Sequence, residues 1–224
     1  RGFSQRICPN GQPPRNVFRL DLHAAAAASF IGLAHDKLVW SMTSGMHWQA
    51  LLSELPCASP LAFPLDSQLC CKLDLSAGNP ALHRFDPGIT ADFTDFIREQ
   101  MAISGAGYAA GGYAENRTLY AMSPVFSPSG DSAETRTLHL GVDLWLAAGS
   151  SVHAVLPGRV HSCRDNAAFG DYGPTVLLEH RLESGLFYTL YGHLARESLA
   201  ASPVGRELQA GELLLRPFVP ADAD

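Results

Sequence analysis

The sequence predicts a mainly β protein with a smaller α+β part at its N-terminal end. Glycine and proline are frequent, at 20 and 15 of the 224 residues, and both favour turns over long helices. Beyond Leu138 the chain alternates short apolar runs with turn residues, a spacing typical of β-strands. No helical pattern of about 10–15 residues separates these runs, which disfavours a parallel βαβ sheet. We therefore expect an antiparallel β-sandwich or a partly open barrel.

The pattern along the chain predicts three parts. Residues 1–70 form a poorly defined, part-helical segment. Within it, Asp21–Ala34 is rich in alanine, the best helix former, and Trp48–Leu55 is a second short helix candidate. Residues 71–136 supply a helix and strand that lead into the β domain and pack on it. Residues 137–224 form the β domain itself.

The lead-in contains two elements that the residue pattern supports. Lys72–Leu75 is expected to be a short strand, and Thr90–Ile103 has apolar residues at the spacing of an amphipathic helix. Gly105–Gly112 carries four glycines but lacks the lysine of a phosphate-binding loop. We interpret it as a flexible connection into a strand at Arg117–Met122.

Short strands dominate the β domain. Turn residues follow or precede each of them, and Glu183-Ser184-Gly185 separates two runs that can form a hairpin. The predicted strands are Val142–Leu146, Ser151–Val155, Gly158–His161, Thr175–His180 and Phe187–Tyr191.

Composition limits the classes of function. Hydrophobic residues make up 46% of the chain and charged residues 17%, which excludes a disordered polyelectrolyte. The net charge of -6 argues against a nucleic-acid partner, because such binding depends on neutralising phosphates. The longest apolar run, Ala24–Ala34, falls short of the roughly 20 residues that a membrane span needs. We expect no membrane span.

The cysteines bear on the compartment. All five lack CxxC spacing, which fits free thiols and favours a cytoplasmic location. A signal upstream of Arg1 would instead place the protein in the cell envelope.

Two motifs carry the residues that can perform chemistry. His139 and Asp143, in the run HLGVD, offer an imidazole and a carboxylate, which bind zinc at roughly 2.0–2.2 Å. An extended strand would separate their Cα atoms by about 13 Å, so the chain must bend, and Gly141 can permit the bend. His193 follows a predicted strand in the run YGHL. Taken alone, HLGVD also fits a surface histidine and a turn aspartate. Taken alone, YGHL also fits a half-buried, hydrogen-bonded histidine.

Four stretches taken in order resemble the lysostaphin/LytM class of zinc peptidases, which cut peptide stems or cross-links in bacterial cell walls. They read HLGVDLWLAAGSSVHAVLPGRVHS, GPTVLLEH, YTLYGHL and GRELQAGELL, and lie between about Thr137 and Leu214. The resemblance implies that His139 and Asp143 are zinc ligands and that His193 is catalytic. It also implies a peptide substrate, whose carbonyl is attacked by water that the metal activates.

The sequence departs from this family at one decisive place. Members complete the site with a His-x-His pair on a late strand, whereas here QAGELL is followed by LRPFVPADAD, without a histidine after His193. With two protein ligands, one fewer than usual, we expect weak or absent zinc, an incomplete site and a β domain that lacks its last strand. His180 matches a position that is often histidine in the family and receives no role, while His153 and His161 are interpreted as structural.

A finer resemblance concerns the surrounding sequence. DNAAFGDYGPTVLLEH, LDLSAGNP and GGYAENRTLY are similar to the peptidase-type module between kinase-like phosphotransferase and aminotransferase domains of long bacterial fusion proteins. Such neighbours would then belong to the same polypeptide. Two other interpretations stay open: a non-catalytic LytM-like binding or regulatory module, and a carrier-like β domain. The second lacks the hairpin lysine that a lipoyl or biotinyl group requires.

Overall fold

The computed structural model describes residues 17–24, 55–65, 69–84, 90–113, 115–117, 137–167, 171–183 and 185–215. In chain order the elements are β1 (Val17–Ala24), β2 (Cys70–Leu73), η2 (Pro80–Arg84), α2 (Thr90–Ser104), β3 (Tyr108–Gly111), β4 (Glu115–Asn116), β5 (Leu138–His139), β6 (Gly141–Ala147), β7 (Val152–His153), β8 (Gly158–Asn166), β9 (Gly173–Leu182), β10 (Gly185–Tyr191), α3 (Arg196–Ala200), β11 (Glu207–Leu208) and β12 (Leu213–Leu215).

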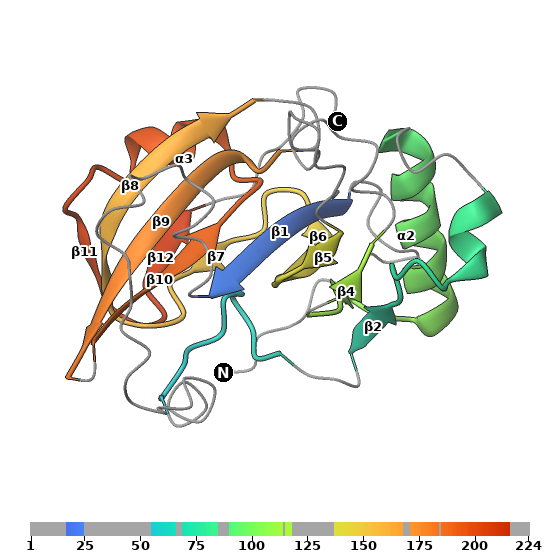
Figure 1. The fold of residues 1–224 in the computed structure, drawn as a ribbon, viewed down its shortest axis with the longest axis horizontal. Coiled ribbons are helices and arrows are strands. Elements are labelled where there is room, and N and C mark those ends of the chain that lie inside the picture. Colours follow the sequence, from blue (N-terminus) through green and yellow to red (C-terminus); the bar gives the residue numbers. More distant parts are fainter. Residues whose placement is uncertain are drawn as a thin grey trace, which may run out of the picture.

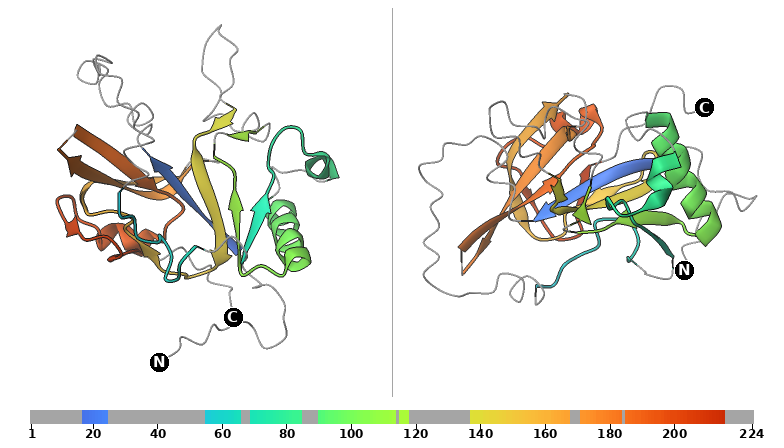
Figure 2. Two further views of the ribbon diagram at one scale, coloured as in Figure 1. Left: turned by 90° about the horizontal axis from the view of Figure 1, so that it is seen from below. Right: turned by 45° about the vertical axis from the view of Figure 1, so that its right-hand side comes forward.

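One eight-stranded sheet organises these elements. Its order is β11-β8-β9-β10-β1-β6-β3-β2, and it curls into a half-barrel (Figures 1 and 2). Neighbouring strands in it are antiparallel except β2 and β3, which run parallel. The prediction of a mainly β fold is therefore confirmed for the part of the chain that the structure describes.

Several elements occur where their sequence patterns predict them. The helix α2 covers the predicted Thr90–Ile103 and extends it by one residue. The predicted hairpin is formed by β9 and β10, with Leu182 opposite Gly185. The other predicted strands of the β domain are present with shifted ends, and β8 is much longer than predicted because it pairs along β9.

Two predictions of local structure are wrong. Residues 21–24 of the predicted Asp21–Ala34 helix belong to β1, whose residues before the alanines alternate between apolar and polar. The glycine-rich stretch contains β3 rather than only a connection, and a side chain at Gly111 would come within 3.1 Å of the Trp145 ring. Small residues there let β3 lie close to that indole. Residues 25–34, 48–54 and 118–122 lie outside the described residues.

The sheet buries apolar side chains on both faces. Leu144, Val176 and Leu178 belong to the main core on one face. On the other face Trp145 packs with Ile97 and Met101 of α2, which lies beside the β2–β3 end of the sheet (Figures 1 and 2). Because side chains alternate along a strand, Asp143 shares the face of Trp145. No helix in the described ranges is long and apolar enough to cross a membrane.

The cysteines within the described residues are free thiols. They are Cys57, Cys70, Cys71 and Cys163, and Cys8 lies outside the described ranges.

Candidate metal centre

His139 and Asp143 meet at a bend between two strands. The short strand β5 ends at His139 and β6 begins at Gly141, so the break falls at Leu140. The bend brings His139 Nε2 to 3.4 Å from Asp143 Oδ1, and their side chains are only 2% and 0% exposed. The structure thus brings together the two residues that the sequence predicts as metal ligands.

The spacing of these two atoms suits a shared zinc ion. Two ligands at roughly 2.0–2.1 Å from one tetrahedral zinc lie about 3.3 Å apart. His139 Nδ1 lies 3.5 Å from the Gly112 carbonyl oxygen. If Nδ1 carries the hydrogen, the Nε2 lone pair and Asp143 Oδ1 can both take part in binding a metal ion. The two residues therefore fit the donor set of a zinc site.

Arg117 holds the other oxygen of the Asp143 carboxylate. Its Nη1 donates a hydrogen bond to Asp143 Oδ2, and its Nε donates to Glu115 Oε2 at 2.7 Å. Glu115 Oε1 in turn accepts a hydrogen bond from the Leu75 amide at 2.9 Å. This chain of charged hydrogen bonds fixes the Asp143 carboxylate so that Oδ1 faces His139.

Sequence reasoning did not find Arg117 or Glu115 as site residues. They lie within GGYAENRTLY, a stretch for which the sequence indicates only a similarity to a module of bacterial fusion proteins. Strand β4 pairs with β5 and puts Glu115 opposite His139, and Arg117 follows directly. Gly111 borders the guanidinium, since a Cβ atom there would lie 2.7 Å from Arg117 Nη2. No local pattern encodes this arrangement.

His193 lies beyond the end of β10 in an uncommon conformation. Its φ of 54° is the only positive value for a non-glycine residue among the described residues. The backbone N–H of His193 donates to the Tyr172 carbonyl at 2.7 Å, and the two rings are 6.4 Å apart between centroids. In the sheet, β1 separates β10 from β6, so these strands are about 10 Å apart.

The remaining described histidines of the β domain make local contacts. Both ring nitrogens of His180 have partners at 2.8 Å, the Pro157 carbonyl and Thr189 Oγ1, and its ring stacks on Phe187. Burial lowers the pKa of His180, so the neutral imidazole is favoured. His153 Nδ1 lies 2.9 Å from the Gly211 carbonyl oxygen. His161 packs edge-on against Tyr188.

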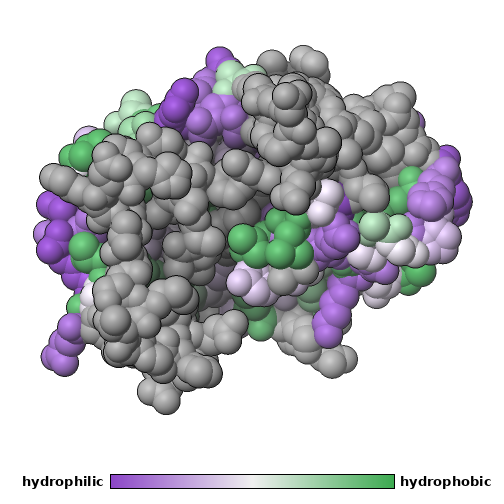
Figure 3. Space-filling model, viewed as in Figure 1, coloured by the Kyte–Doolittle hydropathy of each residue, from purple (hydrophilic) through white to green (hydrophobic). Residues whose placement is uncertain are grey.

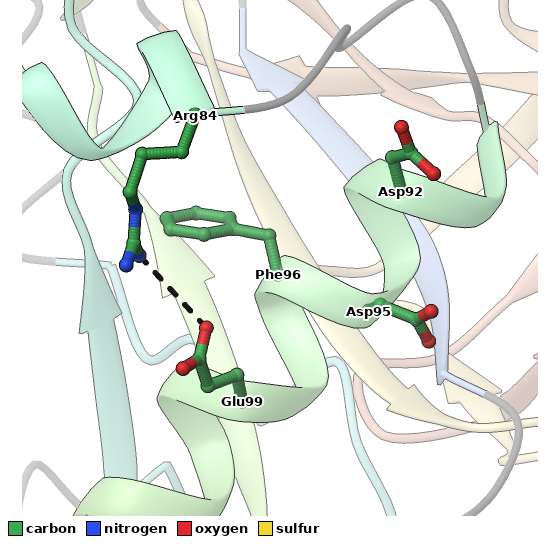
Figure 4. A pocket seen from close by; sticks show the side chains of 5 residues that line it. All are labelled: Arg84, Asp92, Asp95, Phe96 and Glu99. Atoms are coloured by element: carbon green, nitrogen blue, oxygen red, sulfur yellow. Dashed lines mark ion pairs between the residues drawn. The ribbon is translucent and has the colours of Figure 1, made fainter.

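Two surface hollows lie away from the His139–Asp143 pair. One, of 440 Å³, lies between η2 and α2, where Arg84 forms an ion pair with Glu99 beside Phe96, while Asp92 and Asp95 point away from that ion pair (Figure 4). The other, of 350 Å³, is lined by Arg159 and Glu179 among others. Burial raises the pKa of Glu179, but hydrogen bonds from Arg181 and Arg159 outweigh this effect and lower it overall. Neither hollow is lined by a predicted site residue.

The surface beside the metal-ligand candidates is partly apolar. Figure 3 shows apolar surface over β5, and Leu138, the neighbour of His139, is 53% exposed. Within the side chains that the structure describes, no group of three or more His, Cys, Asp or Glu residues is placed to hold a metal ion.

No protein-family model matches this chain, and neither a curated protein nor a solved structure matches it.

Proposed function

We propose that this chain is a zinc metalloendopeptidase-type module of the lysostaphin/LytM class, with an incomplete site that lacks the His-x-His pair, and that cell-wall peptide is its class of substrate. The observation that carries the proposal is the buried His139–Asp143 pair, whose Nε2 and Oδ1 atoms are spaced for one zinc ion. The ordered sequence stretches around it and the curled antiparallel sheet support the same class.

Each residue of the site has a distinct task in this proposal. His139 and Asp143 bind the metal, and Arg117 orients Asp143 through Oδ2. Zinc, when bound, supplies Lewis acidity and brings the pKa of water towards neutrality. His193 donates a hydrogen bond to the attacked carbonyl oxygen as negative charge develops there. Leu138, exposed beside the pair, contacts apolar parts of the peptide.

Zinc titration and peptide hydrolysis by purified variants test this function. Any zinc binding and hydrolysis that the wild-type chain shows should be lost together in His139→Ala, whereas His193→Ala should keep the zinc binding and lower only the turnover rate. His161→Ala is the matched control, because His161 contacts Tyr188 and Ser162 instead of the pair. Zinc binding that persists unchanged in His139→Ala would overturn the proposed site.

The ion pair between Arg117 and Asp143 favours a second candidate function. A permanent cation on Asp143 reduces the need for a metal there, and the same scaffold would then bind peptide without cutting it. A chain that binds stem peptides in calorimetry, but takes up no zinc and cleaves nothing, would establish this non-catalytic module.

A further inference from the structure

Tyr172 contacts the segment that carries His193 through both its backbone and its side chain. The Tyr172 carbonyl oxygen accepts a hydrogen bond from the His193 backbone N–H at 2.7 Å, and the Pro174 carbonyl oxygen accepts one from the Leu194 N–H at 3.0 Å. A Cβ atom on Gly192 would lie 3.2 Å from Tyr172 Cδ1 and 3.3 Å from Tyr172 Cβ, which is tighter than most contacts of a real Cβ atom. The absence of a side chain at Gly192 therefore lets Tyr172 lie directly against this segment.

The Tyr172 ring lies on the face of the sheet that carries Asp143. The strands β6 and β10 belong to one sheet, on either side of β1 (Figure 1). Leu144 of β6 and Tyr191 of β10 belong to the main core, so their neighbours Asp143 and Leu190 lie on the opposite face. The Tyr172 side chain packs against the small apolar cluster that contains Leu190. Tyr172 and the candidate metal centre therefore share one face.

His193 has a backbone conformation that residues with a side chain adopt sparsely. Its φ of 54° lies in the left-handed region, which glycine enters at no steric cost. Such conformations persist only where the surrounding structure fixes them, and they cluster at functional sites. Here the hydrogen bond to the Tyr172 carbonyl fixes the backbone of His193. The ring of Tyr172, at 6.4 Å between centroids and 53° between ring planes, restricts the orientation of the imidazole.

We propose that Tyr172 is a positioning residue, whose ring holds the His193 imidazole in one orientation. This inference rests on the proposed function, in which His193 donates a hydrogen bond to the attacked carbonyl oxygen. Such a donor stabilises the transition state only if it is aimed in advance at the position where charge develops. The two contacts of Tyr172 can be separated by mutation, because its carbonyl oxygen is retained whatever side chain residue 172 carries.

Nuclear magnetic resonance of the His193 side chain in the full chain tests the proposal without an activity assay. Coupling constants about the Cα–Cβ bond of His193 should report one dominant rotamer in the wild-type chain. Tyr172→Leu removes the ring but keeps an apolar side chain, and its couplings should shift to the averaged values of several rotamers. Tyr172→Phe keeps the ring and should retain the wild-type couplings. The signals of His161, which contacts Tyr188, are the control and should not change.

Gly192→Ala is the second variant, for use if Tyr172→Leu does not fold. The new Cβ atom would push the Tyr172 ring away from His193, so the same averaging of the His193 couplings is expected. Rotamer averaging in the wild-type chain would overturn the proposal. Wild-type couplings in a folded Tyr172→Leu variant would also overturn it.

Peptide hydrolysis separates this positioning role from the proposed function. Tyr172→Leu should lower the kcat of any hydrolysis that the wild-type chain shows by about 10- to 100-fold, with KM and zinc affinity unchanged, whereas Tyr172→Phe should not. A higher KM at unchanged kcat would assign Tyr172 to substrate binding and overturn its positioning role. Equal losses in the two variants would show that the hydroxyl group acts, and would overturn it too. A wild-type chain that neither binds zinc nor cleaves peptide would refute the proposed function, while the His193 couplings would still decide how Tyr172 acts on the imidazole.

Discussion

Arg117 supplies a buried positive charge to the candidate site. Its side chain is 1% exposed and joins the buried Asp143 to Glu115. Arg117→Met keeps much of the volume but leaves two carboxylates without this cation. Because breaking a buried ion pair costs about 3–5 kcal/mol, we expect a loss of that size in the free energy of unfolding, measured with urea.

Arg84→Met is the matched control for Arg117→Met. Arg84 is 62% exposed and lies 3.9 Å from Glu99, and such surface pairs contribute about 0–1 kcal/mol. Equal losses in the two variants would contradict the buried network around Asp143.

His180 should make the stability of the protein depend on pH. Burial lowers the pKa of His180 in the folded state, whereas the unfolded chain has the ordinary value of about 6.5. The unfolded state then binds more protons just below that pH, so the contribution of His180 is fully present above pH ~6.5 and is lost as the pH falls. We therefore expect the free energy of unfolding, measured with urea, to fall between about pH 7 and pH 5, and to fall more in the wild-type chain than in His180→Gln.

His83→Gln is the control for this pH dependence, because His83 is exposed on η2. It should retain the wild-type pH dependence. Parallel stability curves for His180→Gln and the wild-type chain would show that His180 does not carry the effect.

At the scale of elements, β8 and β9 depend on a close approach at Gly158. A Cβ atom there would lie 2.7 Å from His180 Nδ1 and 2.9 Å from the Glu179 carbonyl oxygen. Since the carbonyl is part of the paired backbone of β9, the strands must move apart. Gly158→Ala should therefore lower the free energy of unfolding by about 1–3 kcal/mol in urea.

Gly107→Ala provides the comparison for Gly158→Ala. A Cβ atom at Gly107 would have nothing within 4 Å, so this change should be neutral or stabilise by up to about 1 kcal/mol. If Gly158→Ala is as mild as Gly107→Ala, β8 and β9 do not pack as closely as described.

Across the whole molecule, local sequence patterns predicted the elements that local forces determine. Helical spacing identified α2, and turn residues identified the β9–β10 hairpin. The strand β1 escaped prediction because its alanine-rich neighbourhood favours a helix locally, whereas pairing with β6 and β10, distant in sequence, overrides that propensity.

In the candidate site, too, some residues follow from a local sequence motif and others only from the assembled sheet. His139 and Asp143 were predicted as partners because they share one short motif with a glycine that can bend. Arg117 reaches Asp143 from a segment 26 positions earlier, directly after the strand β4 that pairs with β5. Such partners follow from the assembled sheet and not from any local run of residues.

The geometry of the proposed metal site depends on the assembled sheet, so zinc should stabilise the whole fold. His139 and Asp143 flank the β5–β6 bend, which pairing with β4 and β1 holds in place, so global unfolding must separate the ligands. Zinc at about 100 times its dissociation constant should add about 2.7 kcal/mol to the free energy of unfolding. For a chain of this size that raises the thermal midpoint by about 5–10 °C, measurable by scanning calorimetry with zinc and then with a chelator. His139→Ala should show no such rise. A rise of equal size in His139→Ala would mean that zinc binds elsewhere, for instance at the free thiols of Cys70 and Cys71.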